Sequence, residues 1–117
     1  MNTISVKGRK LSINAHSVHF DAEIEEIIDL NESVIVLILP EKDFAFINNI
    51  YSVKDGKITW RIEDTSNYNP NYISRPYSGI RVYEKDRRLI IVNDFMGRRF
   101  LIDPQNGKIV GQESSVR

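Results

Sequence analysis

The sequence predicts an all-β fold made of antiparallel strands. Apolar and polar side chains alternate in several short runs, and turn signals that contain glycine separate these runs. In addition, residues 33–62 and 88–112 repeat each other as blade-like units. We expect two four-stranded meanders packed as an open sandwich or a twisted half-barrel, with an N-terminal hairpin, in a single domain of residues 1–117.

The composition argues against several classes of protein. Lysine plus arginine equals aspartate plus glutamate at 16 each, so no basic excess favours nucleic acid or an anionic membrane as a partner. The chain has no cysteine, which excludes disulfides, a thiolate nucleophile and cysteine metal sites. The first residues lack the apolar core of a signal peptide, and no apolar run approaches the length of a membrane span. We therefore expect a cytoplasmic protein.

Residues 48–63 form the clearest predicted hairpin. An Asp55-Gly56 pair interrupts the apolar pattern, and such a pair favours a type I′ turn because glycine accepts a positive φ. After the turn, three apolar side chains alternate strictly with polar ones: Ile58, Trp60 and Ile62. Trp60 is the only tryptophan, and we interpret it as a buried anchor whose indole N–H needs one partner.

Residues 2–20 predict a short hairpin that turns at Gly8. His16 and His19 follow it, and they are the only two histidines of the chain. A metal site here would need ligands that converge from elsewhere. We therefore interpret both histidines as partly exposed residues of an edge strand rather than as metal ligands or an acid–base pair.

Residues 21–32 contain six acidic side chains and no basic one, and their local structure is the hardest to predict. A strand would turn one acidic side chain inward, unless a bulge at Glu25-Glu26 resets the register. A helix with Asp21 as its N-cap would align four apolar side chains on one stripe: Phe20, Ile24, Ile27 and Ile28. Both structures are compatible with this segment alone.

The next run, residues 33–39, is almost entirely apolar, as is typical of a central strand covered on both faces. Because such a strand needs neighbours, we favour a strand for the acidic segment and a hairpin through Asn31-Glu32. Residues 41–47 would then connect to the next hairpin, with Phe44 and Phe46 available to cap the core.

The second half predicts a loop followed by four strands. Residues 64–78 are rich in tyrosine, asparagine, serine and proline, a composition typical of a long surface loop without regular structure. The strands are expected at residues 78–84, 88–93, 98–103 and 108–112. The predicted core draws on inward positions along the whole chain: Val34, Val36, Ile38, Ile50, Ile58, Trp60, Ile62, Ile80, Val82, Leu89, Ile91, Phe100, Ile102 and Ile109.

The repeat itself resembles a known motif. NNIYSVKDGKITW at 48–60 matches RRFLIDPQNGKIVG at 98–111, and VIVLILP at 34–40 matches LIIVNDF at 89–95. Meanders of four strands that repeat about every fifty residues are the signature of propeller blades. These phrases are similar to the blade motif of pyrroloquinoline-quinone type propellers, which implies four-stranded meanders. Two blades cannot close a ring, and Gly111 replaces a tryptophan of the motif, so we expect no quinone and no other cofactor.

An acidic cluster is the first predicted partner-binding surface: Glu23, Glu25, Asp29 and Glu32. It would complement a basic protein and increase the association rate. Basic charge is concentrated in the second half, at Arg87, Arg88, Arg98 and Arg99. In the alternative interpretation, the acidic side chains are solvated strand faces that only serve solubility.

The loop 64–78 is the second predicted surface, with Tyr68, Tyr72, Arg75 and Tyr77. Tyrosine and arginine are enriched at binding hot spots, because they offer large contact area together with hydrogen bonds. In the alternative, the tyrosines pack back onto the sheet.

Small size, absence of cysteine, β structure, an acidic cluster and a tyrosine-rich loop together are similar to bacterial immunity proteins of contact-dependent growth inhibition and other polymorphic toxin systems. This resemblance of type implies stoichiometric binding of a cognate toxin domain, such as a basic nuclease, through the acidic face. The alternative function is a small stand-alone β scaffold or ligand-binding domain. The sequence shows no nucleophile elbow, glycine-rich phosphate loop or spaced metal ligands, so we expect neither an enzyme nor a metal site.

Overall fold

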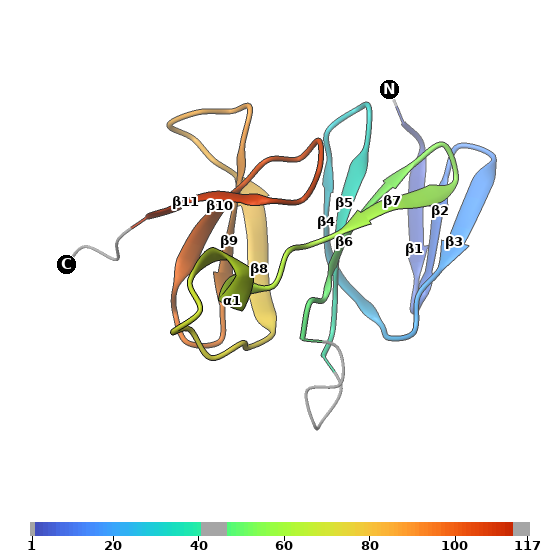
Figure 1. Ribbon diagram of the computed structural model, residues 1–117. Helices are drawn as coiled ribbons and strands as arrows, with labels where there is room; N and C mark the ends of the chain where they lie inside the picture. Colours follow the sequence, from blue (N-terminus) through green and yellow to red (C-terminus); the bar gives the residue numbers. More distant parts are fainter. Residues whose placement is uncertain (1, 41–46, 114–117) are drawn as a thin grey trace.

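Three antiparallel meanders lie face to face in the computed structural model, which describes residues 2–40 and 47–113 (Figure 1). The N-terminal sheet contains β1 (Ile4–Lys7), β2 (Lys10–Ile13) and β3 (His16–His19). The central sheet contains β4 (Ile24–Asp29), β5 (Val34–Ile38), β6 (Ile50–Lys54) and β7 (Lys57–Arg61). The C-terminal sheet contains β8 (Tyr77–Val82), β9 (Ile90–Asp94), β10 (Arg99–Ile102) and β11 (Ile109–Glu113). The all-β fold with two four-stranded meanders is confirmed, as an open stack.

The predicted N-terminal hairpin is part of a three-stranded sheet, because β3 pairs with β2. His16 and His19 begin and end β3, an edge strand, and both are exposed, as expected. The expected capping by Phe44 and Phe46 falls in residues 41–46, outside the described part of the chain.

Strand β5 is the centre of the molecule, since all five of its residues are buried. Ile35 and Leu37 pack toward the C-terminal sheet, in a cluster that includes Phe100. Val34, Val36 and Ile38 pack toward the N-terminal sheet, in a second cluster with Leu11 and Phe20. A strand covered on both faces explains why the run is continuously apolar.

The acidic segment forms strand β4, and the register with β5 shifts between Ile24 and Glu26. The bulge leaves Glu25 without a partner residue on β5. As a result, Ile24 packs on the side of the N-terminal sheet, whereas Ile28 packs on the side of the C-terminal sheet. A bulge inserts one residue and therefore inverts the alternation of faces beyond it.

The Asp55-Gly56 turn has positive φ at both residues, 53° and 76°, as a type I′ turn requires. A second bulge leaves Thr59 unpaired, so that Ile58 lies opposite Val53 and Trp60 opposite Ser52. Ile58 and Trp60 therefore face opposite sides, and the prediction that Ile58 belongs to the core is wrong, since it is 45% exposed.

Trp60 joins the central and C-terminal sheets. Its Nε1 donates to the carbonyl oxygen of Pro104 at 2.9 Å, and its ring packs on Gly107. Trp60 is only partly buried, as are three other residues of the predicted core: Ile80, Val82 and Leu89. The expectation of one partner for the indole N–H is confirmed.

The loop 64–78 was predicted to lack regular structure, and this is wrong at both ends. Asp64 caps a single helical turn, α1 (Thr65–Tyr68), by accepting the N–H of Ser66. Tyr77 begins β8 and is only 1% exposed. Both four-stranded sheets also begin one strand before the repeat units 33–62 and 88–112, because their first strands, β4 and β8, lie outside the repeated phrases.

Candidate functional site

Strand β4 places the predicted acidic residues along one edge of the central sheet. Among the described strands it pairs only with β5, and the Glu26 carboxylate reaches from the face of β4 to the stacked strand β8, where it accepts the Ile80 N–H at 3.1 Å. The four carboxylates of the acidic strip, defined as Glu23, Glu25, Asp29 and Glu32, are all exposed. All four therefore lie at the surface, on β4 and on the segments that flank it.

Asp29 differs from the other three members of the acidic strip. Its carboxylate accepts the backbone N–H of Asn31 at 2.8 Å and the side-chain amide of Asn2 at 2.9 Å. Asp29 therefore stabilises the β4–β5 turn in addition to contributing charge. Within residues 2–40 and 47–113, the carboxylates of Glu23, Glu25 and Glu32 form no hydrogen bond or ion pair.

Three arginines of the C-terminal sheet and its loops, in contrast, have acidic partners, whereas Arg81 and Arg87 have none among the described residues. Arg88 pairs with Asp86 at 2.9 Å and Arg98 pairs with Asp94 at 2.8 Å. Glu113 accepts from three donors: Tyr83 Oη, Lys85 Nζ and Arg99 Nη1. The hydrogen bond from Tyr83, followed by the two cations, lowers the pKa of the Glu113 carboxyl although its partial desolvation acts to raise it. Charge is therefore compensated locally at Arg88, Arg98 and Arg99, whereas no carboxylate of the acidic strip has an ionic partner in the described part of the chain.

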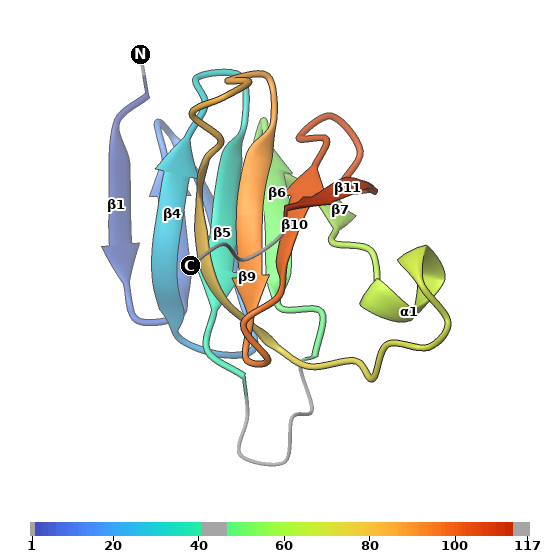
Figure 2. The same cartoon turned by 90° about the vertical axis from the view of Figure 1, so that its left-hand side faces the viewer.

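The helical part of the tyrosine-rich loop, α1, lies at the opposite edge of the stack from β4, and the loop then runs back across the stack to β8 (Figure 2). Tyr68 and Tyr72 both meet the ring of Phe100 edge-on at 6.0 Å between centroids. The Tyr72 hydroxyl donates to Gln112 on β11, the strand farthest from β8 in the C-terminal sheet. The loop therefore packs back onto the C-terminal sheet, whereas the acidic strip follows the central sheet.

The remaining loop residues are mostly structural. Tyr77 is a core residue whose hydroxyl donates to the Glu63 carbonyl oxygen at 3.1 Å, so its ring is not available to a partner. Burial raises the pKa of the Tyr77 phenol far above its usual range. Arg75 donates to the carbonyl oxygen of Ser74 within the loop. Next to them, sequence reasoning missed three exposed apolar side chains: Ile73, Phe95 and Met96.

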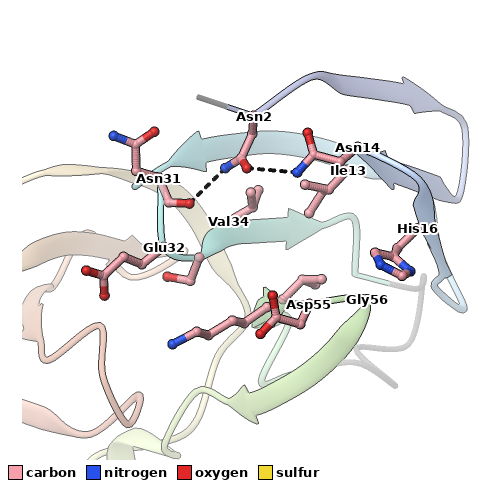
Figure 3. Close-up of a pocket in the computed structure, with 12 residues that line it drawn as sticks. Asn2, Ile13, Asn14, His16, Asn31, Glu32, Val34, Asp55 and Gly56 are labelled. Carbon is pink, nitrogen blue, oxygen red and sulfur yellow. Dashed lines mark hydrogen bonds between the residues drawn. The ribbon is translucent and has the colours of Figure 1, made fainter.

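Sequence reasoning also missed a pocket of about 80 Å³ at the end of the stack (Figure 3). The turns β2–β3, β4–β5 and β6–β7 surround it. We call it the end pocket, and its lining is: Asn2, Ile13, Asn14, His16, Asn31, Glu32, Ser33, Val34, Val53, Lys54, Asp55 and Gly56.

The end pocket contains three residues with positive φ that are not glycine: Asn14, Asn31 and Asp55, with φ of 56°, 73° and 53°. Asparagine and aspartate adopt this conformation more readily than other residues, which is why they occupy these turns. An Asn or Asp at each of the three turns was the signal available in the sequence, although only the turns at Asn31 and Asp55 were predicted. It could not show that the three turns converge.

The structure thus defines an open stack of β meanders with an acidic edge and a small pocket at one end. Among the described residues, no three His, Cys, Asp or Glu side chains converge as metal ligands, and no helix has the length and apolar character to cross a membrane. The chain belongs to the family described as Domain of unknown function (DUF7957), whose model matches residues 1–114. No curated protein and no solved structure matches it. The family description names no activity.

Proposed function

We propose that the protein is a binding module that captures a basic protein partner through the acidic strip. In this proposal its role is that of an immunity protein, which neutralises a cognate toxin domain, such as a nuclease, by stoichiometric binding. The supporting observation is the concentration of carboxylates without ionic partners on and beside β4. Glu23, Glu25 and Glu32 have no ionic partner in the described part of the chain, whereas the arginines at 88, 98 and 99 have one and those at 81 and 87 do not.

Solubility alone would be served by interspersed charges of both signs. A surface of one sign instead creates a field that attracts an oppositely charged protein and accelerates association by about 10- to 1,000-fold. Exposed carboxylates add little to folding stability, since even a paired surface charge contributes only about 0–1 kcal/mol. The single sign of residues 21–32 is therefore better explained by recognition than by stability.

The acidic strip has the dimensions of the centre of an interface. Strand β4 has six residues, so it extends over about 20 Å at a rise of about 3.3 Å per residue. A standard interface buries about 800 Å² on each partner, which is a patch roughly 30 Å across. Glu23 and Glu32 flank β4 and extend the charge at both ends. A partner docked here would cover the whole strip. The proposed function is binding alone and involves no catalytic step by this protein.

A pull-down from lysate of the native host, with this protein as bait, tests the proposal. The bait is compared with a Glu23→Lys/Glu25→Lys/Glu32→Lys variant. Asp29 is left unchanged because it supports the β4–β5 turn. Two single variants form a matched pair, Glu25→Lys on the strip and Glu84→Lys on an exposed site beyond β8, since both make the same change in charge.

We expect one basic domain to be recovered with the wild type and with Glu84→Lys, weakly with Glu25→Lys and not with the triple variant. The rate at which this domain associates with the wild-type protein should fall steeply as the salt concentration is raised, because the Debye length shortens to about 8 Å at 0.15 M. An equimolar amount of bait should abolish any nuclease activity of that domain. Recovery of nothing, or of the same proteins with every bait, would contradict the proposal and favour the scaffold or ligand-binding alternative.

A further inference from the structure

The end pocket has the chemistry of a receptor for an aliphatic cation. We propose that it binds the side chain of a lysine or arginine that the partner inserts, an inference that rests on the proposed function for the source of that side chain. The pocket continues the acidic strip, because Glu32 belongs to both. Figure 3 shows the turns that carry Asn14, Asn31 and Asp55 around one hollow.

Three apolar residues contribute to the wall of the end pocket: Ile13 from β2, Val34 from β5 and Val53 from β6. The two valines are each 1% exposed, so among these three a ligand would contact mainly Ile13. A volume of about 80 Å³ exceeds the roughly 10–15 Å³ that a single water molecule needs, so it also has room for a short alkyl chain. Lysine and arginine bury their methylene stems on such surfaces and keep the charged group at the rim.

Two of the three amide side chains at the pocket, those of Asn2 and Asn14, already have hydrogen-bond partners. Asn14 Nδ2 donates to Asn2 Oδ1 at 3.2 Å, while Asn14 Oδ1 accepts the Thr3 N–H at 3.0 Å. Asn2 Nδ2 in turn donates to the Asn31 carbonyl oxygen at 3.0 Å. These bonds tie the N-terminus to two of the three turns. They hold the end pocket open in a defined shape before any ligand arrives.

The carboxylates at the rim are the groups that remain available. Across residues 2–40 and 47–113, neither the Glu32 nor the Asp55 carboxylate forms a hydrogen bond or an ion pair, and both residues are exposed. An ammonium or guanidinium group offers several N–H donors to such acceptors. The rim therefore favours a cation over a neutral alkyl group.

His16 and Lys54 define the other walls. His16 packs so closely on Gly56 that a Cβ at that position would lie 3.0 Å from the His16 Cβ, which leaves the imidazole as a fixed wall. Lys54 is the lysine of the rim, and its charge opposes a second cation. Removing the Lys54 charge should thus tighten the binding of a cation, which no purely structural role of the pocket predicts.

NMR titration of the full-length protein with n-butylammonium, and with n-butanol as the neutral probe of the same length, tests this inference. We expect saturable shifts of the Val34 and Val53 methyl groups and of the Gly56 amide with n-butylammonium only. Glu32→Gln and Asp55→Asn should each weaken this binding about twofold to fivefold, the range of an exposed ion pair. Lys54→Ala should strengthen it. Asparagine tolerates positive φ, so Asp55→Asn keeps the turn intact.

Absence of saturable shifts at these groups, or equal shifts with n-butanol, would overturn the inference, as would a Lys54→Ala variant that binds more weakly. The probe requires no protein partner, so this result is separate from the pull-down. If the partner is captured through the acidic strip but n-butylammonium does not bind, the end pocket is not a cation site and the proposed function still holds. If n-butylammonium binds but no partner is captured, the end pocket is a cation site and the proposed function is contradicted.

Discussion

Asn49 provides a direct test of how the central and C-terminal sheets are held together. Its side chain is fully buried in the segment that leads into β6. The amide nitrogen donates to the carbonyl oxygens of Ile38 at 2.7 Å and Tyr77 at 3.0 Å. The amide oxygen accepts the Tyr77 N–H at 2.8 Å. One side chain therefore connects the end of β5 to the start of β8.

We expect Asn49→Leu to lower the free energy of unfolding by about 3–4.5 kcal/mol, because each of three buried backbone groups loses a bond worth about 1–1.5 kcal/mol. That is a large part of the stability of about 5–15 kcal/mol that is typical of a domain. At this chain length the melting temperature should fall by about 10–20 °C.

Urea unfolding, followed by Trp60 fluorescence and far-UV circular dichroism, measures the effect. The matched control is Asn67→Leu, an identical change at an exposed position of α1, where about 0.5 kcal/mol or less is expected. If Asn49→Leu costs less than about 1 kcal/mol, or no more than the control, then the bonds of Asn49 do not join the sheets in the way described.

Two further predictions concern stability. Gly107→Ala should lower the free energy of unfolding by about 2–4 kcal/mol, because φ is +76° and the new Cβ would lie 2.5 Å from Trp60 Cε3. The control is Gly97→Ala, where φ is +81° and no atom lies within 4 Å of the new Cβ. It should lower the free energy of unfolding by only about 1 kcal/mol. Equal urea midpoints for these two variants would contradict the packing of Gly107 on the indole. Burial acts to raise the pKa of Asp64, but hydrogen bonds from Ser74, Ser66 and Asn48 outweigh it and place the pKa below 3.8. Ionised Asp64 thus stabilises the fold above pH 3.8, and this contribution is lost as the pH falls through the lower pKa of the folded state. When urea unfolding is measured at a series of acidic pH values, the free energy of unfolding of Asp64→Asn should therefore fall less with pH than that of the wild type.

Local sequence was sufficient to predict most strands and several turns. The apolar run of β5 and the Asp55-Gly56 turn are dictated by neighbouring residues, through burial on both faces and through positive φ. The change of face in β7 was not predicted, and the bulge at Glu25-Glu26 in β4, which the structure confirms, was only one of the alternatives that the sequence left open. Bulges at Glu25 and Thr59 depend on pairing with another strand, and each bulge moves the following side chains to the opposite face.

The candidate site shows the same division. Sequence alone identified Glu23, Glu25, Asp29 and Glu32 as one acidic group, because they lie close together in a single segment and stay together in any fold that exposes it. It could not separate the acidic group from the tyrosine-rich loop, since that separation depends on which edge of the stack each segment occupies.

The strand order, the turn chemistry and the clustering of acidic charge were thus determined by the sequence itself, through interactions between residues that are near one another in the chain. Only the tertiary structure decided that Tyr77 is buried while Tyr68 stays exposed, and that three distant turns form the end pocket. The physical reason is that sheet stacking brings together residues far apart in sequence, and no local pattern records which faces will meet.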